Sequence, residues 1–461
     1  MRSDRHSLKM EQDCICAPAT PAGSGALGVI RISGKGTKGI VSRIFSPKNA
    51  ASAMHDRQVR FGEITDGGEC LDEVLLWTFS APHSYTGEEM AEISCHGSAY
   101  IMQRMLELLI RNGCRMAEPG EFTRRAFLNG KMDLSQAEAV ADLIASDSRA
   151  SHQLAFSQMR GGYAQELRTM RDELIRMVSL LELELDFSEE DVEFADRNQL
   201  KELNSTLSGK VERLIGSFRM GNALKKGIPV AIVGRPNTGK STLLNALLSD
   251  DRAIVSPIAG TTRDTIEECM TIEGVTFRFI DTAGLRESGD TVEAMGIERS
   301  RKAIDNAEMV LHLTDMNETA EESGTALGEY GRKGKKCIVL HNKEDLAETP
   351  RYGKVSDNPV TYRISALRGE GLDELKRQLA RMAGFEGRSG EVMLTNLRHY
   401  EALLNVRSAL EEMRSGLECG RTPDLLSIDA RNAIRHLGEI TGEVTNNDIL
   451  GEIFSRFCIG K

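Results

Sequence analysis

The segment at residues 234–241 constrains the fold of this chain more than any other. Its sequence, GRPNTGKS, fits the pattern GxxxxGK[ST], follows a short apolar run at 230–233 and precedes a helical pattern at 242–248. Glycines let the backbone close around phosphate oxygens, and the N–H groups at the start of the following helix attract anions. The order of strand, phosphate-binding loop and helix predicts an α/β domain of the P-loop class.

The side chains of this loop have distinct expected roles. We expect Lys240 to reach the β- and γ-phosphates of a nucleoside triphosphate and to act in catalysis, and the Ser241 hydroxyl to bind Mg²⁺. The residues predicted to surround the phosphates are Asn237, Thr238, Gly239, Lys240, Ser241 and Thr242.

Two further segments belong to the expected phosphate and Mg²⁺ site. The sequence DTAG at 281–284 follows an apolar strand at 277–280 and fits the acidic motif whose glycine senses the γ-phosphate. Earlier in the chain lies GTTRD at 260–264, where Thr262 is the candidate threonine that completes the Mg²⁺ shell. The nucleotide-binding residues predicted in the acidic motif are Asp281, Thr282, Ala283 and Gly284.

A fourth motif selects the base. Asn342, Lys343 and Asp345 end another apolar strand and fit the pattern NKxD. Guanine presents two adjacent N–H donors, and one carboxylate can accept both, whereas adenine would leave that carboxylate unpaired. Ser365 and Ala366 stand where a Ser-Ala pair backs the base, although Leu follows them in place of the usual Lys. Four ordered motifs predict that the chain binds GTP and GDP.

The means of hydrolysis is not evident from these motifs. Many GTPases carry a glutamine directly after the acidic motif to position the attacking water, but here the residue is Leu285. The charged neighbours that could take its place are Arg286, Glu287, Asp290 and Glu293. For any one of them, the alternative is an ordinary charge on a mobile loop.

Periodicity along the chain predicts several domains. With 461 residues, about two to four domains are expected. Helical patterns on both sides of the P-loop region indicate one helical domain interrupted by an inserted α/β domain, and the alternative is two separate helical domains. The predicted divisions are residues 1–130 (mixed α and β), 131–224 (helical), 225–384 (inserted α/β) and 385–461 (helical).

Composition limits the partners and the location. Lys and Arg number 58 against 69 Asp and Glu, and the formal net charge of −11 disfavours broad electrostatic capture of nucleic acid. No apolar run reaches the roughly 18 residues needed to cross a bilayer, and the charged first residues lack the apolar core of a signal peptide. We therefore expect a cytoplasmic location, no membrane contact and reduced cysteines, which number nine without zinc-site spacing.

From about Ala19 to its last residue, the chain resembles the MnmE (TrmE) family of tRNA-modification GTPases. The resemblance depends on specific segments, including those at 260–264 and 281–287 in the α/β region. The others are ATP at 19–21, IRISG at 30–34, SYTGE at 84–88, PGEFTRRAFLNGK at 119–131 and FCIGK at 457–461. Two departures are Ser98, where the family has glycine, and residues 1–13, which extend the N-terminus with no evident role.

The resemblance implies a multidomain homodimer. Its parts would be an N-terminal α+β domain that binds folate and dimerises, a helical domain, and a Ras-like G domain inserted into it. Members act with the flavoprotein MnmG to add a carboxymethylaminomethyl or aminomethyl group at C5 of the wobble uridine of certain tRNAs. The implied cofactors are GTP, Mg²⁺, K⁺ and formyl- or methylene-tetrahydrofolate, and G-domain dimerisation in potassium stimulates hydrolysis.

The resemblance also assigns ion-binding and catalytic residues. Asn237 and the loop at 256–261 would hold K⁺, with Ser256, Ile258 and Thr261 as ligands from that loop. Glu293 matches the catalytic glutamate, which would orient the attacking water in place of the missing glutamine.

A second set of residues matches the folate site of the family. Arg31, Glu92, Lys131 and Lys461 occupy its contacting positions; a carboxylate can bind the amino-amide edge of a pterin, and cations can pair with a glutamate tail. Cys458 would serve the modification reaction, and the alternative is a packed thiol.

Two other classes of protein share parts of this pattern. A ribosome-assembly or signalling GTPase would carry an RNA-binding module with a basic face or a second G domain, and the sequence has neither. A folate-dependent methyltransferase with a degenerate G domain is disfavoured because every nucleotide motif is intact.

Overall fold

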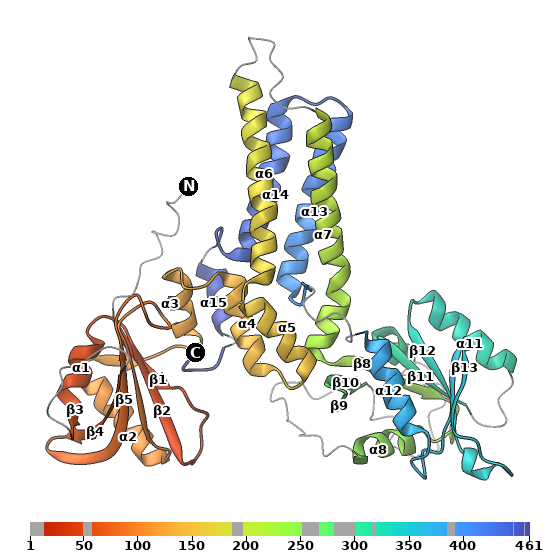
Figure 1. The fold of residues 1–461 in the computed structure, drawn as a ribbon, viewed down its shortest axis with the longest axis horizontal. Coiled ribbons are helices and arrows are strands. Elements are labelled where there is room, and N and C mark those ends of the chain that lie inside the picture. Colours follow the sequence, from red (N-terminus) through yellow and green to blue (C-terminus); the bar gives the residue numbers. More distant parts are fainter. Residues whose placement is uncertain are drawn as a thin grey trace. The chain divides into compact units, whose positions relative to one another are not determined.

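The computed structural model divides the chain into two compact units, each described here by itself (Figure 1). Unit 1 comprises Met1–Ala141, Gln158–Glu212 and Glu401–Lys461, and unit 2 comprises Asp142–Ser157 and Arg213–Tyr400. The residues that the structure describes are 13–48, 58–186, 197–250, 267–280, 301–314, 320–384, 392–445, 447–455 and 457–461.

Unit 1 begins with a seven-stranded sheet in the order β3-β4-β5-β6-β2-β1-β7, in which only the β1–β7 pair is parallel. The strands are β1 (Cys14–Pro18), β2 (Leu27–Ser33), β3 (Phe45–Pro47), β4 (Val59–Asp66), β5 (Glu69–Phe79), β6 (Met90–His96) and β7 (Cys114–Met116). Burial alternates along β2, where Ile30 and Ile32 are buried on the face covered by α1 (Thr37–Ile44) and α2 (Ala99–Arg111). This is the predicted α+β part.

Helix α3 (Glu121–Leu128) covers part of the other face through Phe122, which packs on Ile15 and Ala17 of β1. A buried guanidinium fixes this helix. Arg125 pairs with Glu121 at 2.8 Å and Asp13 at 2.7 Å. Burial opposes ionisation of Glu121, but hydrogen bonds from arginines outweigh it and hold the pKa of this carboxyl below its usual value.

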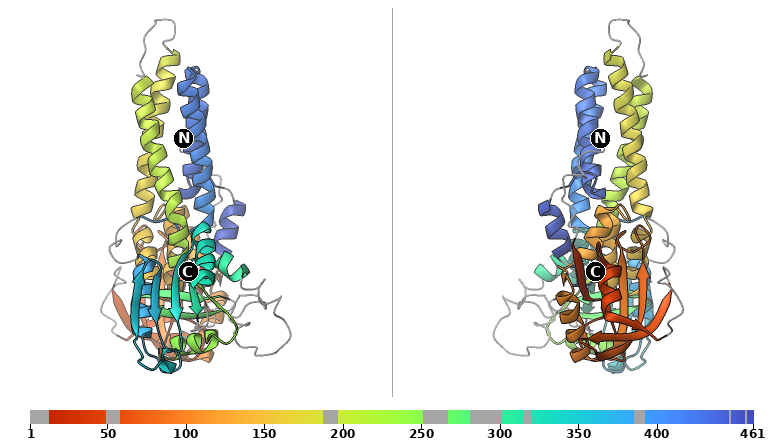
Figure 2. Two further views of the ribbon diagram at one scale, coloured as in Figure 1. Left: turned by 90° about the vertical axis from the view of Figure 1, so that its right-hand side faces the viewer. Right: turned by 90° about the vertical axis from the view of Figure 1, so that its left-hand side faces the viewer.

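The helical segments on the two sides of the insertion pack together. In unit 1, α6 and α14 lie side by side (Figure 2), and the Asn204 amide of α7 donates to the Leu410 carbonyl of α13 at 3.2 Å. The helices are α4 (Leu134–Ala145), α5 (Arg149–Met159), α6 (Gly162–Asp186), α7 (Arg197–Lys226), α13 (Leu397–Glu418), α14 (Pro423–Thr441) and α15 (Asn447–Ser455).

The inserted part of unit 2 is an α/β domain, as predicted. Its sheet has the order β13-β14-β12-β11-β8-β10-β9, parallel except at the two edge strands. The strands are β8 (Ile228–Gly234), β9 (Glu268–Ile272), β10 (Val275–Phe279), β11 (Met309–Thr314), β12 (Lys336–His341), β13 (Gly353–Asp357) and β14 (Val360–Arg363).

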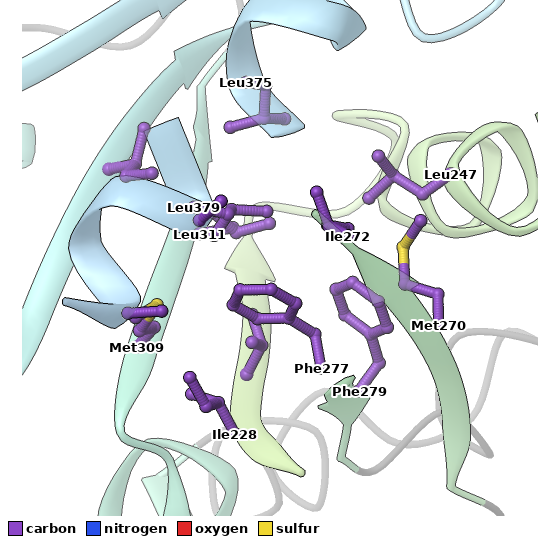
Figure 3. Packing of buried hydrophobic residues seen from close by; sticks show 14 of the residues in the cluster. Ile228, Leu247, Met270, Ile272, Phe277, Phe279, Met309, Leu311, Leu375 and Leu379 are labelled. Carbon is purple, nitrogen blue, oxygen red and sulfur yellow. The ribbon is translucent and has the colours of Figure 1, made fainter. Parts of the chain in front are cut away.

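Apolar side chains cover both faces of this sheet. On one face, Phe277 and Leu311 pack under α8 (Lys240–Asp250) and α12 (Leu372–Ala383), as Figure 3 shows. On the other, Val310 packs against the helical residues 301–306 and against Tyr330 of α11 (Ala320–Arg332). Burial on both faces explains the continuous apolar runs of the central strands.

The chain enters and leaves the insertion at neighbouring points. The Leu394 N–H donates to the Ser217 hydroxyl at 3.0 Å, and the rings of Phe218 and Tyr400 stack with centroids 4.4 Å apart. A pair of adjacent ends is what insertion of one domain into another requires.

Two further expectations can be compared with the structure. Over the part of the chain that the structure describes, no helix is both long and apolar enough to span a bilayer. All nine cysteines are free thiols.

Gly442 should be more sensitive to substitution than a left-handed glycine in open space. It ends α14 with φ +80°, and a Cβ there would lie 2.7 Å from the Phe127 ring and 2.8 Å from Leu134. Gly420 has φ +68° but open space around it, so its replacement measures the cost of a side chain at positive φ without a packing clash. We expect Gly420→Ala to cost roughly 1 kcal/mol of unfolding free energy and Gly442→Ala roughly 2 to 4, measured by urea denaturation. Equal losses would contradict this packing.

Candidate functional site

Three segments of the predicted nucleotide site meet at one edge of the unit 2 sheet. Strands β8, β11, β12 and β14 are parallel, so their carboxyl ends share that edge. The phosphate-binding loop follows β8, Asn342 follows β12, and Ser365 comes shortly after β14. Ligands of open α/β sheets bind at such an edge.

Two glycines of the phosphate-binding loop tolerate no side chain. Gly234 has φ +152° and Gly239 has φ +96°; a Cβ would overlap the Leu313 carbonyl oxygen at the first and the Asn342 amide at the second. Asn237 has φ +64°, a conformation that Asn adopts more readily than most residues. The loop is therefore held close to β11 and to the base-selecting motif.

Lys240 closes the loop on itself. Its Nζ donates to the carbonyl oxygens of Gly234 at 2.9 Å and Arg235 at 2.8 Å, and burial lowers its pKa. The hydroxyl of the buried Thr238 also donates to the Arg235 carbonyl, at 2.9 Å. Since α8 begins at Lys240, Ser241 and Thr242 stand in its first turn, where the helix N-terminus attracts anions.

Asn342 connects the loops around the base. Its amide donates to the Thr238 carbonyl at 2.8 Å and accepts from the Ala366 N–H at 2.9 Å. The neighbouring Lys343 has φ +67°. These bonds place the NKxD motif beside both the phosphate-binding loop and the Ser-Ala pair.

Asp345 is half-buried and oriented by Ser365. The Ser365 hydroxyl donates to Asp345 Oδ1 at 2.6 Å, and this hydrogen bond holds the pKa of the carboxyl below its usual value. The group is therefore ionised at neutral pH, the form that accepts two hydrogen bonds.

The rest of the predicted nucleotide and ion site lies outside the described residues. This holds for Leu285, Arg286, Glu287, Asp290 and Glu293. It holds equally for Ser256, Ile258, Thr261, Thr262, Asp281, Thr282, Ala283 and Gly284. Among the residues that are described, no group of three or more His, Cys, Asp or Glu side chains could hold a metal ion.

A second constellation lies in unit 1, around Arg31. Arg31 and Glu92 are cross-strand partners on β2 and β6, and their side chains form an ion pair at 2.8 Å. The guanidinium carbon lies 5.1 Å from the ring centroid of Tyr85 and 5.7 Å from that of Phe122. The cation is thus held between a carboxylate and two aromatic rings.

The last residues of the chain reach this constellation. Arg31 donates to the Gly460 carbonyl at 3.3 Å, and Gly460 has φ +95° with no room for a Cβ beside the Pro18 carbonyl. Burial and the charge of Arg31 lower the pKa of Lys461, although Glu92 opposes them. Cys458 is exposed.

The predicted folate residues are only partly brought together. Arg31 and Glu92 form an ion pair, and the charges of both affect the pKa of Lys461. Lys131 is exposed and donates to the Pro82 carbonyl at 3.0 Å, so its contact is with the loop that carries Tyr85. Sequence reasoning missed Tyr85 and Phe122, although both lie in the segments that carry the resemblance.

Comparison with known proteins covers both units. A family model described as the MnmE helical domain matches residues 134–458, and one described as the GTP-binding protein TrmE N-terminus matches residues 14–131. A "tRNA modification GTPase MnmE" from Bacteroides thetaiotaomicron is 50% identical over 470 residues, covering 98% of this chain and 100% of that protein. The chain belongs to the MnmE family of tRNA modification GTPases.

Other MnmE proteins match as fully. Those of Cytophaga hutchinsonii and Porphyromonas gingivalis are each 50% identical, covering 97% and 98% of this chain and 98% of each relative. The predicted family and combination of domains are confirmed, and the P-loop domain is that of a GTPase. The departure at Ser98 is accommodated, because this residue precedes α2 with φ −85°.

Replacing the carboxylate that selects the base should change nucleotide preference. In Asp345→Asn, the amide cannot accept both guanine donors, so we expect GTP affinity to fall about 10- to 100-fold and affinity for xanthosine triphosphate to rise. Titration of both nucleotides measures this, with Asp373→Asn in the first turn of α12 as a matched control. Unchanged GTP affinity would exclude Asp345 from the base site.

Proposed function

We propose that this chain is a potassium-dependent GTPase that acts with the flavoprotein MnmG on the wobble uridine of certain tRNAs. The pair would add a carboxymethylaminomethyl or aminomethyl group at C5, using a one-carbon unit from formyl- or methylene-tetrahydrofolate. The observation that carries the proposal is the presence in one chain of a guanine-nucleotide edge and of the Arg31–Glu92 constellation. The names of its relatives support the link to tRNA.

The proposal includes the assembly and location. The chain would act as a cytoplasmic homodimer, with hydrolysis coupled to dimerisation of the G domains. The proposed domains are 1–130 (folate binding and dimerisation), 131–224 and 385–461 (helical), and 225–384 (G domain). By contacts, residues 142–157 of the first helical part belong to the unit that holds the G domain.

Lys240 changes partners when GTP binds in this proposal. It releases the carbonyls of Gly234 and Arg235 and pairs with the β- and γ-phosphates. Thr238 still donates to the Arg235 carbonyl, so that carbonyl is not left unpaired. Ser241 and Thr262 would bind Mg²⁺, and Asp281 would belong to the acidic motif of the same site. This ion would neutralise charge on the phosphates.

Hydrolysis needs a substitute for the missing glutamine at Leu285. We assign water orientation to Glu293 and charge neutralisation to a K⁺ ion held by Asn237, Ser256, Ile258 and Thr261. The role of Asn237 as a K⁺ ligand is supported by its exposure on the phosphate-binding loop and by its side-chain amide oxygen. A cation at this position would take the place of an arginine finger.

The unit 1 constellation fits a folate in its chemistry. The carboxylate of Glu92 would accept hydrogen bonds from the pterin, and Lys131 and Lys461 would pair with its glutamate tail. Arg31 would serve mainly as an anchor, because Glu92 and the Gly460 carbonyl already engage it. The exposed thiol of Cys458, two residues from Gly460, would serve the modification reaction.

Nucleoside analysis tests the function and the tail together. Cells that lack this protein should lose the modified wobble uridine, and the full chain should restore it, as read by mass spectrometry of tRNA nucleosides. A chain without residues 458–461 should fail to restore it and yet hydrolyse GTP within about twofold of the full chain, since the tail bonds to Arg31 and Gly120 of unit 1. Unchanged nucleosides in the deletion strain would refute the function; loss of both activities would indicate a folding role for the tail.

Potassium should accelerate hydrolysis through Asn237. We expect GTP turnover in KCl to exceed that in NaCl by about tenfold or more, and Asn237→Gly to lose this response while binding GTP in NaCl as before. Glycine is the suitable replacement because φ is +64° at this position, where alanine would add strain. Equal turnover of the unmutated protein in the two salts would exclude the ion.

A further inference from the structure

The hairpin of β9 and β10 lies between two segments that are predicted to sense the nucleotide. Strand β9 begins at Glu268, shortly after Thr262, and β10 ends at Phe279, shortly before Asp281. The turn consists of Glu273 and Gly274, with φ of +50° and +82°. Movement at either end of the hairpin would therefore reach this turn.

The hairpin is bonded to the start of α5 and to the residues just before it. The Gly274 carbonyl accepts the Ala150 N–H at 2.9 Å, and the Thr276 hydroxyl donates to Asp147 Oδ1 at 3.2 Å. A Cβ at Gly274 would lie 2.9 Å from the Cβ of Arg149. The backbones approach so closely that only glycine fits.

Packing strengthens this attachment. Ala150 is fully buried in the same core cluster as Ile272 and Val275, and Leu154 packs against that cluster. Lys225, near the end of α7, pairs with Asp142 of α4 at 2.7 Å. These contacts explain why residues 142–157 fall in the G-domain unit although they precede the insertion by a long stretch of sequence.

Helix α4 leads from this attachment back into unit 1. At its other end, Leu134 and Ala137 share a buried cluster with Phe127, Phe454 and Phe457. Phe457 directly precedes Cys458, and the Cys458 carbonyl accepts the Gly120 N–H at 3.5 Å. The chain from α4 through residues 146–148 to the start of α5 thus runs from the residues that seat the tail to those that contact the hairpin.

We propose that the segment from α4 to the start of α5 couples the nucleotide state of the G domain to the tail at Arg31. The hairpin acts on it through the Gly274–Ala150 and Thr276–Asp147 bonds, and α4 carries the change to the Phe454–Phe457 cluster. The inference deepens the proposed function, because it supplies the link between GTP hydrolysis and the unit 1 site. Coupling of this kind requires an element that both sites bias.

Thr276→Val tests the coupling with little change in shape. Hydrogen exchange of amides in residues 134–157 should differ about fivefold or more between GDP and a non-hydrolysable GTP analogue in the unmutated chain, and this difference should disappear in the variant. GTP affinity should stay within about twofold, and wobble-uridine modification should fall about fivefold or more. Thr276→Ser should restore both readouts.

Thr271→Val is the matched control. Thr271 faces Thr276 across the same hairpin, and its hydroxyl lies 3.5 Å from the Thr276 hydroxyl. The Thr271 variant keeps the Thr276–Asp147 bond, so it should behave as the unmutated chain. Exchange that is insensitive to nucleotide in the unmutated chain, or a nucleotide-dependent difference that persists in Thr276→Val, would overturn the proposal. The hydrogen-exchange measurement uses no tRNA. If the proposed tRNA modification is wrong, the exchange result still tests the coupling by itself.

Discussion

The side-chain amide of Asn342 links the loops at the edge of the unit 2 sheet where the nucleotide is expected to bind. It is a single group that donates to the phosphate-binding loop and accepts from the Ser-Ala loop, and it is buried. The parallel sheet brings these loops to one edge, but only approximately. The two hydrogen bonds convert that proximity into a fixed spacing between the phosphates and the base, and such preorganisation lowers the entropic cost of binding a nucleotide.

A comparable arrangement holds the unit 1 site, although its parts come from opposite ends of the sequence. Arg31 lies between Glu92, two aromatic rings and the carbonyl of Gly460. A planar guanidinium can meet a carboxylate, a carbonyl and a ring face at once, which an ammonium cannot do as well. The tail is thereby seated by a side chain of β2, an inner strand of the N-terminal sheet.

Local motifs made the nucleotide site predictable from the sequence, whereas contacts between distant segments of the chain could not be predicted. Glycines at 234 and 239, Asn342 and Asp345 follow fixed spacings, because each belongs to one loop after one strand. The resemblance gave Arg31 and Glu92 as candidate folate contacts, but their pairing with each other and the stacking of Arg31 on Tyr85 and Phe122 could not be read from spacing. The attachment of residues 142–157 to the G-domain unit was missed for the same reason: helical periodicity shows that a face is apolar but not which domain covers it.

The adjacent entry and exit of the insertion, marked by the Ser217–Leu394 bond and the Phe218–Tyr400 stack, has a consequence for synthesis on the ribosome. Helix α6 packs mainly on α14, which is translated only after the whole inserted domain. The G domain can therefore complete its sheet while the helices that carry it still lack their partners. The order of translation thus favours nucleotide binding by the G domain before the helical bundle is finished.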